Sequence, residues 1–246
     1  MKSFKSNIKS TLESMGIYIR FRSNMPIGFD WMTDLKNHTD IMAFRTIFDI
    51  GANVGQTSLP LLRVFEQADI HSFEPTRHAY EILAHRAQQH ERLHSHNIAF
   101  GDQRGSLTIP VVDASLTNTL RPDHEQRTQD AHMENVSVNT VDDFCNEQSI
   151  ERIDVLKCDT EGYDVPILHG AKRMLKSSLI SSLIIETSFD EKNKLQSNFF
   201  EVHELLTSYG YVCAGVYSQP YLMRRSSHGS FCDSLFIVPD LLRYQP

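Results

Sequence analysis

The chain has 246 residues, enough for one α/β domain with a full hydrophobic core. Hydrophobic residues make up 40% of it and charged residues 22%, as in an ordinary globular protein. Its 24 Lys and Arg against 31 Asp and Glu give a formal net charge of −7, which disfavours electrostatic binding to nucleic acid or to an anionic membrane.

The cysteines and the apolar runs bear on the compartment. The four cysteines have neither CxxC nor zinc-site spacing, which favours a reducing environment. No apolar segment follows the basic start "MKSFKSNIKS", so a secretory signal is not expected. No run approaches the roughly 18 apolar residues of a membrane span. We therefore expect a cytoplasmic protein without a membrane span.

Residues 1–43 are expected to form an N-terminal helical cap. Phe4, Ile8 and Leu12 have helical spacing, and Trp31, the only tryptophan, is expected to pack the cap onto the core. Residues 44–246 would then form the main domain.

In this main domain, short apolar strands alternate with helical segments. The expected strands are 46–50, 69–75, 93–100, 106–112, 135–141, 152–159, 180–187, 211–217 and 234–239. The expected helices are 54–67, 77–90, 141–148, 165–178 and 198–210, and Pro60 inside the first suggests a kink. This rhythm predicts a mostly parallel sheet with helices on both faces, and the last two strands predict an antiparallel edge. Ligands of such sheets bind at the carboxyl ends of the strands.

The first such strand end is the stretch "FDIGANVGQTS", residues 48–58. Gly51 allows a tight turn close to a ligand, and Gly55 allows close packing of the next helix. The spacing is not GxGxxG, so a dinucleotide is not the natural ligand, and the carboxylate of Asp49 suits a cationic ligand better. The alternative is an ordinary strand-to-helix turn in which Asn53 is the N-cap.

The next two strand ends add two more carboxylates. Glu74 follows Gly55 by 19 positions, the usual place of the acidic residue that accepts hydrogen bonds from both ribose hydroxyls. Its alternative role is to cap the helix that follows. Asp102, after the strand that ends at Phe100, is a candidate acceptor for an adenine amine, although Gly-Asp is also ordinary turn chemistry.

Taken together, these motifs give the chain a resemblance to a known family. The stretches "FDIGANVGQTS", "FEPTRHAYEIL", "LKCDTEGYDVPILHGA" and "LIIETSF" resemble the FkbM-type S-adenosylmethionine-dependent methyltransferases over residues 46–239. The chain departs from the family at Cys158, where an apolar residue is usual, and at Thr160, where Val or Ile is common. Neither departure removes a carboxylate.

The resemblance implies a class I Rossmann-like fold with a seven-stranded sheet, and methyl transfer to a hydroxyl of a sugar or specialised metabolite. It also implies positions for the cofactor. Asp49 and the turn of Gly51, Asn53 and Gly55 would surround the cationic methionine moiety, Glu74 would bind the ribose, and Asp102 the adenine. Neither the exact acceptor nor the oligomeric state follows from the resemblance.

The chemistry is expected after the strand that contains Lys157. In one interpretation Asp159 or Glu161 is the general base for an acceptor hydroxyl. In another, Asp159 and Glu186, on neighbouring strands of a class I sheet, hold Mg²⁺ that lowers the pKa of that hydroxyl. In a third, Asp159 and Glu161 only anchor a loop. His228, in a polar loop before the last strand, is the alternative base.

Two other functions remain open. An NAD-linked sugar-modifying enzyme is disfavoured, because the third glycine and a Tyr-x-x-x-Lys pair are missing. A non-catalytic Rossmann-like binding module is disfavoured because the chain keeps Asp49, Glu74, Asp159 and Glu161.

Overall fold

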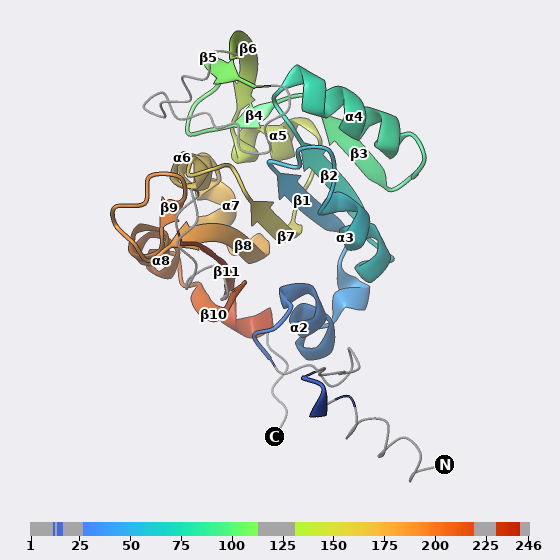
Figure 1. The fold of residues 1–246 in the computed structure, drawn as a ribbon, viewed down its shortest axis with the longest axis vertical. Coiled ribbons are helices and arrows are strands. Elements are labelled where there is room, and N and C mark those ends of the chain that lie inside the picture. Colours follow the sequence, from blue (N-terminus) through green and yellow to red (C-terminus); the bar gives the residue numbers. More distant parts are fainter. Residues whose placement is uncertain (1–11, 13, 17–26, 113–130, 219–229, 242–246) are drawn as a thin grey trace.

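The structure is a computed structural model that describes residues 12, 14–16, 27–112, 131–218 and 230–241 (Figure 1). His228 and most of residues 1–26 lie outside this description. None of the helices in the described ranges is both long enough and apolar enough to cross a membrane.

The central sheet has the strand order β10-β11-β8-β7-β1-β2-β3, and the short β9 pairs with β8. Its strands are β1 (Thr46–Ile50), β2 (Asp69–Phe73), β3 (Leu93–His96), β7 (Ile153–Cys158), β8 (Ile180–Ser188), β9 (Ser197–Asn198), β10 (Val212–Tyr217) and β11 (Cys232–Ile237). All the pairs are parallel except those of β11, which runs antiparallel to both β8 and β10. The predicted mostly parallel sheet is confirmed, but it has eight strands, because the short β9 joins the seven in the continuous order, and its antiparallel strand lies one position in from the edge.

Helices cover both faces of this sheet. They are α2 (Trp31–His38), α3 (Ser58–Val64), α4 (Arg77–Ala87), α5 (Val141–Glu147), α6 (Asp164–Gly170), α7 (Lys172–Lys176) and α8 (Phe199–Ser208), with 3-10 turns at Ile41–Ala43 and Pro239–Leu241.

Neighbouring residues of β1 show how the faces divide, because successive side chains of a strand point to opposite sides. Ile47 packs in a buried cluster with Trp31 and Leu61, from α2 and α3. Phe48 packs in a second cluster with residues of α5 to α8. Trp31 is therefore buried against the core, as expected.

A second, smaller sheet was not predicted. The expected strand 93–100 is broken into β3 and β4 (Ala99–Phe100), and β4 joins β6 (His132–Asn139) and β5 (Gly105–Val111) in the order β4-β6-β5. At the break, the side-chain amide of Asn97 donates to the carbonyls of Glu74 and Pro75, which holds the chain where it leaves the central sheet.

The expected kink at Pro60 is also absent. Helix α3 begins only at Ser58, so Pro60 lies in its first turn. An amide there has no partner within the helix in any case, so the missing N–H of proline costs nothing.

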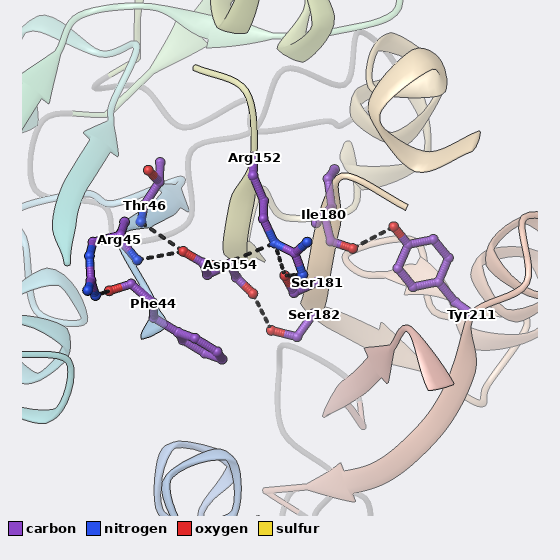
Figure 2. A network of polar contacts seen from close by, with 9 residues as sticks. All are labelled: Phe44, Arg45, Thr46, Arg152, Asp154, Ile180, Ser181, Ser182 and Tyr211. Carbon is purple, nitrogen blue, oxygen red and sulfur yellow. Dashed lines mark hydrogen bonds and ion pairs between the residues drawn. The ribbon is translucent and has the colours of Figure 1, made fainter. Parts of the chain in front are cut away.

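The amino ends of β1, β7 and β8 are joined by a polar network (Figure 2). The carboxylate of Asp154, a buried residue of β7, accepts from the backbone N–H groups of Arg45 at 2.6 Å and Thr46 at 3.0 Å. The guanidinium of Arg152 lies 3.4 Å from the same carboxylate and also donates to Ser181. Every charge in this network has a partner, so it joins the three strands at the end away from the predicted site.

Candidate active site

The glycine turn after β1 brings the ends of two strands into contact. Gly51 has a φ of +77°, and a Cβ atom there would lie 1.9 Å from the backbone oxygen of Asp159. Only glycine fits this approach. Asn53 also has a positive φ, of 47°, but it is not an N-cap, because α3 starts at Ser58 and its N-cap is Thr57. Gly55, with a φ of +88°, allows the turn to pack against Leu83 of α4.

Glu74 connects this turn to the start of α4. One oxygen accepts from the backbone N–H of Asn53 at 3.0 Å, and the other accepts from the backbone N–H and the hydroxyl of Thr76, the N-cap of α4. Burial raises the pKa of Glu74, and these hydrogen bonds counteract the rise. The residue therefore does bind the start of the helix, and at the same time its carboxylate faces the glycine turn.

Asp49 is fully buried beneath the turn. Its Oδ2 accepts from the hydroxyl of Ser58 at 2.7 Å. Its Oδ1 has no hydrogen-bond partner among the described residues, but lies 3.5 Å from Nζ of Lys157. Asp49 thus contacts other side chains of the fold rather than the cavity described below.

The buried Lys157 of β7 bridges two carboxylates. Its Nζ donates to Oδ2 of Asp159 at 3.0 Å, in addition to the contact with Asp49. Burial alone lowers the pKa of Lys157, but the charges of Asp159 and Asp49 outweigh burial and raise it above its ordinary value. The lysine is therefore a fixed positive charge at the carboxyl end of the sheet.

Asp159, Glu161 and Glu186 form a carboxylate cluster in front of this lysine, with one oxygen of each within 4.8 Å of the others. Burial, followed by the charges of Asp159 and Asp164, raises the pKa of Glu161 to about 8. Burial, followed by the charges of Asp159 and Glu161, raises the pKa of Glu186 to about 9. Three negative charges this close repel one another, so a shared proton or a bound cation must balance them near neutral pH.

The cluster and the glycine turn line one cavity of about 210 Å³. Gly51, Asn53 and Glu74 contribute to one part of its wall, and Asp159, Glu161 and Glu186 to another. Apolar residues complete the lining, among them Phe73, Ile98, Phe100, Ile109 and Ile167. The structure thus brings together six of the predicted site residues.

The other predicted site residues lie elsewhere. Asp49 accepts from Ser58 and Gly55 packs against Leu83, and neither lines the cavity. Asp102 is exposed and lies outside the cavity lining as the described residues define it. His228 is outside the described residues, so its proposed role as a base stays a prediction.

Sequence reasoning missed Asp164, a fully buried residue at the start of α6. Its two oxygens accept from the hydroxyls of Thr160 at 2.8 Å and Ser197 at 2.7 Å, so it ties the loop that carries Glu161 to β9. Burial raises its pKa to about 6. An acidic residue in the first turn of a helix is common, so nothing in the sequence singled it out.

Comparison with known proteins identifies the family. Residues 49–213, more than half of the chain, match the model of the methyltransferase FkbM domain. The chain belongs to the FkbM methyltransferase domain family.

Three relatives that this chain matches are distant from it. It is 25% identical over 170 residues to methyltransferase sdnD of Sordaria araneosa, covering 57% of this chain and 65% of that protein. It is 24% identical over 186 residues to methyltransferase 1 of Beauveria bassiana, covering 68% of this chain and 72% of that protein. It is 24% identical over 160 residues to 2-O-methyltransferase NoeI of Sinorhizobium fredii, covering 58% and 66%. The chain thus spans about two-thirds of the length of these relatives.

Solved structures support the fold. The crystal structure of methyltransferase FkbM from Methylobacillus flagellatus KT superposes with a TM-score of 0.51 at 18% identity, over 79% of this chain and 43% of that chain. The METTL16 MTase domain superposes with a TM-score of 0.50 at 13% identity, over 92% and 75%. These likenesses place the chain among Rossmann-like methyltransferase folds.

Proposed function

We propose that this chain is an S-adenosylmethionine-dependent O-methyltransferase that acts on a hydroxyl of a small molecule, a sugar or a specialised metabolite. The observation that carries the proposal is the shared cavity, in which a glycine turn and Glu74 face the carboxylate cluster. Family membership supports methyl transfer, and the 2-O-methyltransferase among the relatives supports oxygen as the accepting atom.

The lining offers a place for each part of the cofactor. The Glu74 carboxylate already accepts three hydrogen bonds from the protein, and a carboxylate has about four acceptor sites, so one site remains for a ribose hydroxyl. The apolar side chains of Ile98, Phe100 and Ile109 suit the adenine ring, and Asp102 lies two residues after the end of β4. The positive sulfonium would then lie on the side of the carboxylate cluster, where opposite charge stabilises it.

The same cluster supplies the proton acceptor. Methyl transfer is an in-line displacement, so the acceptor oxygen must lie opposite the sulfur and lose its proton. Lys157 fixes Asp159 in place through a hydrogen bond. Burial raises the pKa of Glu161 to about 8, and a general base is most effective when its pKa lies near the working pH. We assign proton acceptance to Asp159 with Glu161 beside it.

The alternative role of these carboxylates is to bind Mg²⁺. A hard divalent cation takes oxygen ligands, and Asp159 and Glu186, with Glu161 as the third, present theirs within 4.8 Å of one another. When bound there, the cation would balance the clustered charge and lower the pKa of the acceptor hydroxyl. The residues present therefore fit such an ion.

The test is a methyl-transfer screen with methyl-labelled S-adenosylmethionine and a panel of sugar and polyketide hydroxyls, run with and without a chelator. We expect label on the oxygen of at least one acceptor. Activity that survives the chelator supports the direct base, whereas activity that is lost and then restored by Mg²⁺ supports the metal. Absence of both transfer and cofactor binding in the folded chain refutes the proposal and returns the non-catalytic module to first place.

A further inference from the structure

A second hollow lies beside the carboxylate cluster and has no part in the site described above. It measures about 670 Å³ and lies between the start of α6, the segment that follows β8, and the start of α8. Its apolar part comes from Tyr163, Val165 and Pro166. Its polar part includes Asn193, Gln196, Ser197 and Asn198.

The lining of the hollow adjoins the cluster at two places, once along the chain and once across a strand pair. Gly162, which lines the hollow, directly follows Glu161. Ser197, which lines it on β9, pairs in the sheet with Thr187, and Thr187 directly follows Glu186. The loop after β7 and the paired strands β8 and β9 therefore connect the cluster to the hollow.

Hydrogen bonds hold these two walls in a fixed relation. Asp164 accepts from Thr160, which lines the cavity of the cluster, and from Ser197, which lines the hollow. On the far wall, the side chain of Asn198 accepts from the backbone N–H groups of Phe200 and Glu201, which fixes the start of α8. A molecule seated in the hollow would be positioned by the same elements that position Glu161 and Glu186.

The charge of the hollow restricts what it binds. Its ionisable lining residues are Glu191, Glu201 and Lys194, and the ammonium of Lys194 donates to the backbone carbonyl of Glu191. Two carboxylates against one ammonium leave this lining negative overall. Amides and hydroxyls beside one aromatic ring suit a hydroxylated ring molecule, but an anionic group there meets like charge.

We propose that this hollow is the acceptor subsite, and that its carboxylates select neutral or cationic hydroxylated acceptors over anionic ones. The inference rests on the proposed methyl transfer and deepens it by naming where the acceptor lies and what charge it carries. Acceptors that bear a carboxylate or a phosphate next to the reacting hydroxyl are excluded by it.

The test uses three methyl glycosides that share one ring and differ in charge: methyl β-D-glucopyranoside, its 2-amino-2-deoxy analogue and its uronate. Each is titrated by NMR into the full chain saturated with S-adenosylhomocysteine. We expect the uronate to bind about tenfold more weakly than the neutral glycoside. In the variant Glu201→Lys this difference should shrink at least threefold, while Glu204→Lys, which makes the same charge change one turn further along α8 outside the hollow, should leave it unchanged.

Several results would overturn the inference. One is equal binding of the uronate and the neutral glycoside, another is an equal effect of the two lysine variants, and a third is no binding of any of the three glycosides. Calorimetry with S-adenosylhomocysteine, the product of the cofactor, on the same proteins distinguishes failure of the proposed function from failure of the acceptor subsite. Lack of product binding counts against the proposed function, whereas normal product binding with any of these three results counts against the acceptor subsite alone.

Discussion

Strand β7 carries a carboxylate near each of its ends, and the two meet opposite surroundings. Asp154, near the amino end, accepts from two backbone N–H groups and lies beside Arg152 (Figure 2). Asp159, just past the carboxyl end, has one cation, Lys157, and faces Glu161 and Glu186. One end of the sheet pairs its charges, while the other places like charges together.

The difference separates stability from function along a single strand. A buried carboxylate with enough donors holds the fold together, as Asp154 does. At the other end, burial and neighbouring charge raise the pKa of Glu161 and Glu186 and cost folding free energy. A fold retains such a cluster where chemistry or ligand binding needs it. Exchange of a carboxylate for a neutral group at each end should therefore have different consequences.

The largest effect is expected for Asp159→Asn. The amide keeps the shape but removes the charge that accepts the proton or binds the cation, so methyl transfer should fall by about 10²–10⁴-fold. The affinity for S-adenosylmethionine should fall far less than turnover, because the turn and Glu74 remain. Initial rates with saturating cofactor, on a sample whose thermal melt matches the wild type, measure this. Turnover within about tenfold of wild type, or ~1.4 kcal/mol, would move the catalytic role to Glu161 or His228.

The same exchange at the other end, Asp154→Asn, should lower stability and spare the site. The new amide places an NH₂ group against donors from Arg45, Thr46 or Arg152, and one or more of them loses its acceptor. The free energy of unfolding should fall by about 1–3 kcal/mol. Urea denaturation measures this, with exposed Glu204→Gln as the control expected within about 0.5 kcal/mol of wild type. A loss of cofactor affinity in Asp154→Asn would contradict the division between the two ends.

For Glu186→Gln we expect a smaller change in stability, and in the opposite direction: the variant should be more stable than the wild type at high pH. The pKa of Glu186 in the folded chain, about 9, lies above its ordinary value of 4.5, so between these values the folded chain binds more protons than the unfolded one. Its contribution to stability is complete below about pH 4.5 and is lost as the pH rises through 9. The glutamine, which resembles the protonated acid, has no such loss.

The variant should therefore match the wild type in stability near pH 5 and be the more stable of the two near pH 9. Thermal melts across this range measure the difference. A variant less stable than the wild type at pH 9 would mean that the ionised Glu186 is well stabilised in the fold, and the account of the cluster would then be wrong.

Much of the site was predictable because the sequence shows where the strands end. Apolar runs stop at Asp49, Glu74 and Asp159, and parallel strands bring such ends to one edge of a sheet. The participation of Glu161 and Glu186 in one cluster was only partly predictable. It depends on the positive φ of Glu161, 51°, and of Gly162, 84°, for which the glycine was the only hint.

Other features depend on contacts that no local pattern encodes. Lys157 reaches Asp49 because the two residues pair in register on β7 and β1, and register follows from the packing of the whole sheet. The second sheet was missed because periodicity predicts that "LHSHNIAF" is extended, but does not say which sheet each half joins.

The central claim is that the turn after β1 and Glu74 bind S-adenosylmethionine. Calorimetric titration of the wild-type chain and of Glu74→Ala tests it most directly, with thermal melts to show that both are folded. The account predicts one cofactor per wild-type chain, and binding weaker in the variant by about 1.5–3 kcal/mol for each charge-assisted hydrogen bond lost. No binding heat in the folded wild type, or equal affinity in the two proteins, would contradict it.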